Sequence, residues 1–480
     1  MNWEAVIGLE THVELATSSK MFCGCPVEFG AEPNTLCCPV CLGLPGALPV
    51  PNGSAIEAIV RIGLALDCAI TERSFFHRKN YFYPDLPKNY QISQYDVPIC
   101  VGGHLDVVTG GRTRTVGITR VHMEEDTGKN LHVSEGGRIH DAVASLIDFN
   151  RSGVPLVEIV TEPDLRLADE ARAYGRELQT LVRALGVSHA RLEEGSMRFD
   201  ANVSVRPAGA TELGMRTEVK NVNSLRSMHD AIQFEVERQI AIRERGGTVS
   251  QETRHWDEAT GRTVAGRSKE EAEDYRYFQE PDLVPLYVPA ERVAELEATL
   301  PELPQAREGR YVASGVEART AHLLVVGAGL ADLYDDAVAA GADSRIVANW
   351  LTGEVVAHLR REEAAIDEVT LTASDLAELS AMVAAGEVSA TAAKTVLNDV
   401  LRGEGTPRAV AHVRDLLQMS DADALGDEVD TVLAAHPDAV DKIRGGDVKP
   451  IGFLVGQVMR ATGGKADPKL VSQLIRNRAG

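Results

Sequence analysis

The chain has 480 residues, of which 44% are hydrophobic and 25% are charged, so several domains with apolar cores are expected. Its formal net charge of −22 argues, taken alone, against a nucleic-acid-binding protein, because phosphate contacts require lysine and arginine. The sequence shows no signal peptide and no apolar run of about 18 residues, which predicts a cytoplasmic protein without a membrane span.

The first predicted strand, VIGLETHVEL at residues 6–15, carries three titratable side chains. Glu10, His12 and Glu14 alternate with apolar residues and a threonine. Because positions i, i+2 and i+4 of a strand point to the same side, the three share one face. Two interpretations stay open: a face exposed to solvent, or a site for a cation that relieves the repulsion between the charges.

Five of the seven cysteines lie within residues 23–41. Four of them follow the spacing C-x-C-x12-C-x2-C: Cys23, Cys25, Cys38 and Cys41. Two close pairs of soft ligands are typical of a tetrahedral zinc site, so structural zinc is the preferred interpretation. A reduced cluster without metal and a redox device are the alternatives, and no thioredoxin-like βαβ unit supports the second. Cys37 could replace Cys38 as a ligand, whereas Cys68 and Cys100 are predicted core residues.

The segment HRKNYFYPDLPKNYQISQYD, residues 77–96, interleaves cations with aromatic rings. Lys79 and Lys88 could hold phosphates, and Tyr81 could stack on a base. The alternative is a surface loop pinned by aromatic core residues.

A second titratable cluster, RVHMEEDTGK, occupies residues 120–129. Strand alternation puts Arg120, His122 and Glu124 on one side and Glu125 on the apolar side, where a glutamate is costly unless it is paired or bound to metal. Carboxylates with only one or two imidazoles suit Mg²⁺ or Mn²⁺ better than zinc. Further polar segments follow at residues 148–164 and 193–205.

Strand patterns with antiparallel turn signals dominate up to about residue 290, and short capped helices follow. We therefore predict an α+β fold. A large antiparallel-sheet domain with the catalytic site spans residues 1–292, a helical domain spans 293–400, and a small helical tail spans 401–480. Residues 441–480 hold eight basic and three acidic residues, so this part of the tail is locally +5. It is either a binding module or a solvated helical surface.

Nine segments together resemble the GatB family, which provides one of the subunits of the tRNA-dependent amidotransferases. They occur in order between residues 5 and 471: VIGLETHVEL, FCGC with CPVCLGLPG, HRKNYFYPDLPKNYQISQYD, RVHMEEDTGK, DFNRSGVPLVEIVTEPD, RFDANVSV, EVKNVNSLRSM, RSKEEAEDYRYFQEPDL and IGFLVGQVMRATGGKADP. The resemblance implies a cradle-shaped α+β domain, a helical domain and a tail that reads the tRNA body. It also implies a heterotrimer with a glutaminase (amidase) subunit and a third, small subunit.

Members of that family use ATP to activate the side-chain carboxylate of Glu-tRNA(Gln) or Asp-tRNA(Asn), and ammonia from the glutaminase partner completes the amide. The resemblance and the charges imply Mg²⁺ ligands at Glu10, His12 and Glu125, with Glu124 as a further candidate. Contacts to ATP or the tRNA end are implied for Lys79, Lys88, Tyr81, Arg151, Asp200 and Lys220. Contacts to the tRNA body are implied for Arg460, Lys465 and Lys469.

Two rival functions stay open at this point. A non-catalytic tRNA-binding scaffold would use the polar clusters only to clamp RNA, but bare carboxylates repel RNA and favour the kinase. A free-standing ATP-dependent amide ligase would need its own ammonia source. The sequence shows no G-x-S-x-G elbow, no P-loop and no G-x-G-x-x-G motif, so neither an amidase nucleophile nor a common nucleotide-binding loop is predicted.

Overall fold

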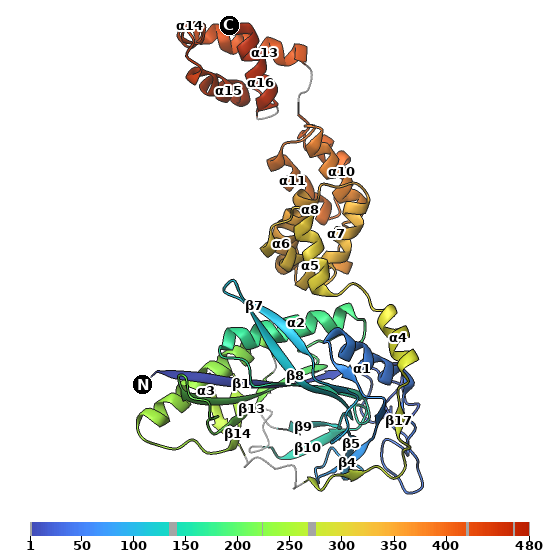
Figure 1. Cartoon of the computed structure of the whole chain (residues 1–480). Coiled ribbons are helices and arrows are strands. Elements are labelled where there is room, and N and C mark those ends of the chain that lie inside the picture. The colour runs from blue at the N-terminus through green and yellow to red at the C-terminus, as the bar shows by residue number, and fades with distance from the viewer. Residues whose placement is uncertain are drawn as a thin grey trace. The chain divides into compact units, whose positions relative to one another are not determined.

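The computed structural model describes residues 2–133, 142–222, 224–266, 275–418, 422–463 and 466–479. The chain divides into two compact units, Met1–Pro304 and Gln305–Gly480. Figure 1 shows mixed sheet and helix in the first unit and helices in the second, so the predicted α+β class is confirmed. None of the helices in the described ranges combines the length and the apolar character needed to cross a membrane.

The first unit is built on a large sheet that contains ten strands in the described part of the chain. In sheet order they are β15 (Arg262–Ala265), β14 (Glu252–Asp257), β13 (Thr217–Val222), β12 (Met197–Pro207), β1 (Trp3–Glu14), β11 (Pro155–Thr161), β8 (Arg112–Glu125), β6 (Cys100–Val101) and β2 (Ala69–Ile70), with β7 (His104–Thr109) paired to β8. The pairings are antiparallel except between β13 and β14. The long strand β1 therefore lies between β12 and β11, which come much later in the sequence.

One face of this sheet is apolar and carries α1 (Gly53–Ala65), α2 (Ala168–Ala184) and α3 (Leu225–Glu244). Alternation along β1 sends Ile7, Leu9 and Val13 into this face, where they are buried in one core with Tyr174 of α2 and Met228 of α3. The same alternation leaves Glu10, His12 and Glu14 on the other face.

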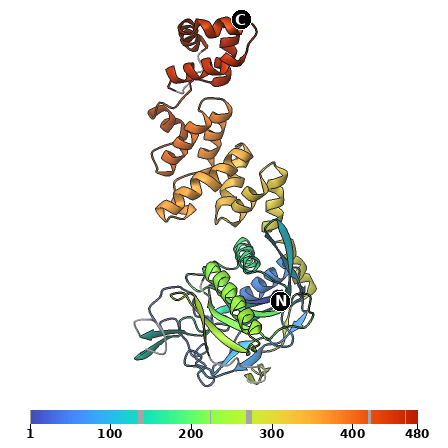
Figure 2. The same ribbon diagram turned by 90° about the vertical axis from the view of Figure 1, so that its left-hand side faces the viewer.

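Smaller sheets lie on that other side and at the edge of the large sheet. They consist of β4 (His77–Asn80) with β5 (Tyr90–Ser93) and β16 (Phe278–Gln279), the hairpin of β9 (Lys129–Val133) and β10 (Ala144–Asp148), and the pair of β3 (Arg73–Ser74) and β17 (Leu286–Tyr287). Figures 1 and 2 show α2 on one side of the large sheet and the β4–β5 sheet and the β9–β10 hairpin on the other, and Figure 1 shows β17 at the edge of the large sheet. The polar face of β1 is consequently the face directed toward the small sheets.

The second unit is helical in its described residues. Its elements are α5 (Pro304–Ala313), α6 (Ala318–Val326), α7 (Leu330–Ala339), α8 (Ser344–Trp350), a π-helical turn (Leu351–Val355), α9 (Val356–Glu362), a 3₁₀ turn (Ile366–Glu368), α10 (Ala373–Ala384), α11 (Ala390–Leu401), α12 (Pro407–Val413), α13 (Ala422–Ala435), α14 (Pro437–Arg444), α15 (Lys449–Ala461) and α16 (Pro468–Ala479). Its described residues form two apolar cores, one running from Tyr311 to Ala411 and one from Leu425 to Ala479.

These cores place the compact regions slightly differently from the predicted boundaries. The helix α4 (Ala290–Ala298) crosses residue 292, and its Leu296 is buried in the core of the first unit. Residue 400 lies within α11, whose last turn shares a core with Val410 of α12. Apolar burial therefore continues past both positions.

Candidate active site

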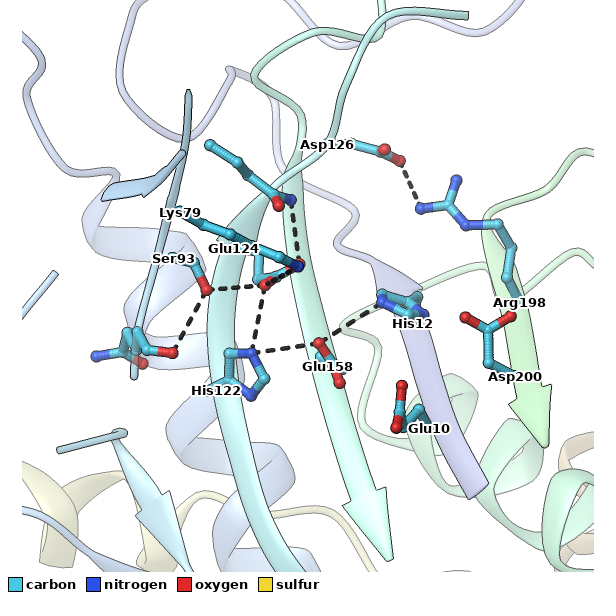
Figure 3. A network of polar contacts seen from close by, with 12 residues as sticks. Glu10, His12, Lys79, Ser93, His122, Glu124, Asp126, Glu158, Arg198 and Asp200 are labelled. Atoms are coloured by element: carbon cyan, nitrogen blue, oxygen red, sulfur yellow. Dashed lines mark hydrogen bonds and ion pairs between the residues drawn. The ribbon is translucent and has the colours of Figure 1, made fainter. Parts of the chain in front are cut away.

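The polar face of the large sheet brings three strands into one row of titratable side chains. His12 of β1 is in register with Glu158 of β11, and Glu158 is in register with His122 of β8. The Nε2 atom of His12 lies 3.6 Å from Oε2 of Glu158, and Nε2 of His122 lies 3.3 Å from the same oxygen. Figure 3 shows these side chains converging with Glu124.

His12, Glu124 and Glu158 form what we call the central group, because one donor atom of each lies within 4.8 Å of the others. Glu124 and Glu158 are buried, with 2% and 7% of their surface exposed. Oε1 of Glu124 accepts a hydrogen bond of 2.8 Å from Ser93 and lies 3.9 Å from Nζ of Lys79. Two carboxylates and one imidazole are a donor set that suits Mg²⁺ or Mn²⁺.

The charges of the central group are held by their neighbours. Burial works against ionisation of Glu124, but the charge of Lys79 and the hydrogen bond from His122 lower its pKa to about 2. Burial likewise opposes the charged form of His122, and the carboxylates of Glu158 and Glu124 outweigh it and raise the pKa of His122 to about 9. Burial also opposes ionisation of Glu158, but the charge of His122 holds the pKa of Glu158 well below its usual range, so both carboxylates face the imidazolium as anions.

A second acidic group lies beside the first on the same face. It consists of Glu10 and Asp200, which are in register on β1 and β12, and Glu218 of β13. Asn202 donates a 2.9 Å hydrogen bond to Glu10, and Nζ of Lys220 lies 2.8 Å from Asp200 and 3.5 Å from Glu218. The structure thus places Glu10, Asp200 and Lys220 together, next to the central group but outside it.

Glu125 is not brought together with Glu10 and His12. Its Oε1 accepts a 2.8 Å hydrogen bond from the backbone of Ile92 and pairs with the ammonium group of Lys88. The side chains of Glu125 and Lys88 are only 4% and 7% exposed, so each needs the other as its counter-charge. Alternation along β8 explains the separation, because Glu124 and Glu125 must point to opposite sides.

Breaking the Lys88–Glu125 pair is expected to destabilise the first unit strongly. Glu125→Ala leaves a buried, unpaired ammonium group, which costs about 3–5 kcal/mol. Combining Lys88→Met with Glu125→Leu removes both charges and should recover most of the loss. Urea unfolding of the full chain measures this, with Glu57→Ala in the exposed Glu57–Arg292 pair as a control. A loss for Glu125→Ala no larger than that of the control would contradict the burial argument.

The other predicted residues fall into two settings. Lys79 lies beside the central group, with its Nζ 5.1 Å from the ring centre of Tyr275, and Tyr275 makes an edge contact of 6.0 Å with Tyr81. Lys79 and Tyr81 thus share one aromatic wall. Arg151 instead donates 3.0 Å hydrogen bonds to the carbonyls of Thr127 and Gly128 and lies 3.7 Å from Asp126, so it supports the turn after β8.

Comparison with known proteins identifies the family. Residues 5–294 match the family described as the GatB/GatE catalytic domain, and residues 332–478 match the GatB domain. The chain belongs to the GatB family. Similar proteins come from Frankia casuarinae (54% identical, covering 100% of this chain and 96% of the relative), Thermobifida fusca (51%; 100% and 94%) and Moorella thermoacetica (50%; 100% and 100%). Each of these relatives is named as the B subunit of an aspartyl/glutamyl-tRNA(Asn/Gln) amidotransferase.

In this GatB-family chain, the four predicted cysteines meet at one point. The sulfur atoms of Cys23, Cys25, Cys38 and Cys41, which we call the cysteine cluster, all lie within 4.8 Å of one another. The Sγ atoms of Cys38 and Cys41 are 3.9 Å apart, close to the roughly 3.8 Å that a tetrahedron with Zn–S bonds of about 2.3 Å requires. The cluster therefore has the ligands and spacing of a structural zinc site. Cys37 lies outside it, with Sγ 3.9 Å from Asn150, and Cys68 and Cys100 are buried core residues as predicted.

The tail of the GatB-family chain presents part of the predicted basic surface. Arg460 lies in the last turn of α15 and is exposed, and Lys469 is exposed in the first turn of α16. The backbone amide of Lys469 donates to Asp467, which caps the helix. Lys465 lies outside the described residues.

Sequence reasoning misses two residues at the centre of the site, His122 and Glu158. Strand alternation places His122 on the correct side of its strand but gives it no role, and Glu158 stands out only as part of a polar segment. The available signal is a lone glutamate within the apolar run PLVEIV. A buried glutamate in such a run needs a partner, but the sequence does not show which one.

Proposed function

We propose that this chain is the kinase and transamidase subunit of a tRNA-dependent amidotransferase. It would phosphorylate the side-chain carboxylate of Glu-tRNA(Gln), Asp-tRNA(Asn) or both with ATP, and then admit ammonia to give Gln-tRNA(Gln) or Asn-tRNA(Asn). The observation that carries this proposal is the buried central group with the ammonium of Lys79 beside it. The names of the full-length relatives supply the substrate class.

The chemistry accounts for the arrangement of charges. A carboxylate is a poor acceptor for ammonia because an oxide would have to leave. When the carboxylate oxygen attacks the γ-phosphorus of ATP and ADP departs, the resulting acyl phosphate carries a good leaving group. Ammonia then forms the C–N bond, the C–O bond to phosphate breaks, and one proton is lost. The acyl phosphate must be kept from water, which suits a site on the face directed toward the small sheets.

Each group in the site has a distinct task in this proposal. His12, Glu124 and Glu158 fit the oxygen-rich ligand set of Mg²⁺, which when bound would offset charge on the transferring phosphoryl group. Lys79 supplies a fixed cation for the phosphates, and the tyrosine rings near it offer a stacking surface. His122 orients Glu124 and Glu158 through the contacts of 3.4 and 3.3 Å. Lys220 is a second cation beside Glu10 and Asp200.

Ammonia in this scheme comes from a glutaminase (amidase) subunit, which joins this chain and a third, small subunit in a heterotrimer. The absence of an amidase nucleophile motif in the sequence agrees with that division of labour. The cysteine cluster would hold one structural zinc ion. Arg460, Lys469 and, from the sequence, Lys465 would contact the tRNA body away from the reacting end.

The tail contribution is testable by its salt dependence. Removing residues 422–480, which include α13–α16 and the core they form, is expected to weaken tRNA binding by the assembled complex. Each lost phosphate contact should reduce the slope of log affinity against log salt by roughly 0.7–0.9. Arg460→Ala tests one contact in an otherwise intact chain, and exposed Arg319→Ala in α6 is the matched control. Equal slopes for the full and shortened chains would show that the tail surface is only solvated.

The proposed function is tested in the complex with its partners. Phosphate release from ATP should require both Mg²⁺ and a misacylated tRNA, and the stimulating tRNA identifies the substrate. Glutamine hydrolysis by the partner provides an independent check that the complex has assembled. A complex that hydrolyses glutamine and binds tRNA but releases no phosphate would identify a scaffold instead of a kinase.

A further inference from the structure

A buried lysine lies against the cysteine cluster. Lys20 has no exposed surface, and its Nζ lies 3.7 Å from Sγ of Cys41 and 3.3 Å from the carbonyl oxygen of Phe149. Among the residues that the structure describes, the hydrogen-bond partners of its ammonium group are this sulfur and this carbonyl. Of the two groups that Lys20 contacts directly, the sulfur is the one that can carry a negative charge.

Two donors approach the sulfur of Cys41, which also lies 3.4 Å from the carbonyl oxygen of Cys38. The Cys41 Sγ accepts a hydrogen bond from the backbone N–H of Cys38, at 3.1 Å, on top of the contact with Lys20. A neutral thiol or a disulfide sulfur is a weak acceptor, and either would leave a buried ammonium group uncompensated, at a cost of several kcal/mol. Among the interpretations of the cluster, four thiolates around a metal balance the charge of Lys20, and so would a metal-free cluster in which Cys41 alone is ionised; the metal content measured below separates these two.

We propose that Lys20 is a positioning residue of the cysteine metal centre, whose ammonium group balances the Cys41 thiolate and slows loss of the metal. The inference rests on metal being held by the cysteine cluster and is independent of the kinase chemistry. Four thiolates around a divalent ion leave a net charge of −2, and Lys20 reduces it to −1. Residues around the ligands commonly alter metal affinity by about 10–100-fold.

The test measures zinc transfer from the purified full chain to a chromogenic chelator. Zinc content is first determined by elemental analysis, and the release rate is then compared for the unmodified chain, Lys20→Met, Lys20→Gln and Lys20→Arg. Lys20→Met and Lys20→Gln are expected to release zinc about 10-fold faster than the unmodified chain or more, whereas Lys20→Arg, which keeps the charge, should stay within a few-fold of the unmodified rate. Lys394→Met, in the second unit and paired with Glu354, controls for loss of a lysine elsewhere.

The Co²⁺-substituted chain provides a second readout. Lys20→Gln should keep the intense sulfur-to-cobalt absorption of four thiolates but shift its energy, because the nearby positive charge is lost. The proposal would be overturned if Lys20→Met and Lys20→Gln both released zinc within about two-fold of the unmodified rate. It would also be overturned if Lys20→Gln matched the unmodified chain and only Lys20→Met released zinc faster. Absence of metal in the unmodified chain would overturn both this inference and the zinc assignment. If Lys20→Met does not fold, the zinc release rates of Lys20→Gln and Lys20→Arg decide.

Discussion

Replacing Glu124 or Glu158 with glutamine is expected to abolish phosphate release from ATP while the complex stays assembled and hydrolyses glutamine. Both changes keep the size of the side chain but remove a charge from the central group. Loss of a ligand that helps to offset phosphoryl charge typically costs several kcal/mol of transition-state stabilisation, which corresponds to roughly 1,000-fold in rate. His12→Ala should have a comparable effect, since His12 completes the same group.

The matched control for this experiment is Glu162→Gln. Glu162 lies directly after β11, the strand that carries Glu158. It is exposed, and its carboxylate accepts a hydrogen bond from Thr119 instead of contacting the central group. Its replacement should leave phosphate release near the level of the unmodified complex. Turnover retained by both Glu124→Gln and Glu158→Gln would rule out the central group as the reaction site.

Serine at any one of the four clustered cysteines is expected to cause the largest loss of stability among single cysteine changes. Structural zinc couples ligand binding to folding, so a missing thiolate should lower both the zinc content and the unfolding temperature of the first unit. Elemental analysis and thermal unfolding of Cys23→Ser and Cys38→Ser measure the two effects. A freshly purified, unmodified chain without metal would favour the reduced cluster instead.

Two cysteines in the same unit provide controls, one close to the cluster and one in the apolar core. Cys37→Ser changes a thiol in the same loop whose sulfur lies outside the cluster, and Cys68→Ser changes a buried thiol that contacts the carbonyl of Gly102 at 2.7 Å. Neither should alter the zinc content. Loss of zinc from Cys37→Ser would mean that Cys37 is a ligand.

The sequence predicts those features of the site that depend on neighbours along the chain. Alternation identifies the polar face of β1 and the division of β8 into sides, and the spacing of the cysteines identifies the cluster. The helix α2 ends at Ala184, two residues before Gly186, a glycine in the left-handed conformation that is typical of helix ends. Each of these features follows from a period of two, a period of 3.6 or a local turn.

What the sequence does not predict is the order of the strands. β11 inserts between β1 and β8, and only this pairing brings Glu158 into register with His12 and His122. For Glu125, two lines of sequence reasoning disagree. Alternation along the strand places Glu125 on the side opposite Glu124, whereas the family resemblance implies a shared role with Glu10 and His12. Its burial against Lys88 depends on β5 packing beside β8, a long-range contact that no local pattern specifies.

The most direct test of the central claim follows oxygen from the amino acid to phosphate. The complex is supplied with glutamine, ATP, Mg²⁺ and a misacylated tRNA whose side-chain carboxylate carries ¹⁸O. If the carboxylate is phosphorylated before amidation, inorganic phosphate must acquire one ¹⁸O atom for each amide formed, and Glu124→Gln should form neither product. Amide formation accompanied by unlabelled phosphate would contradict the proposed function.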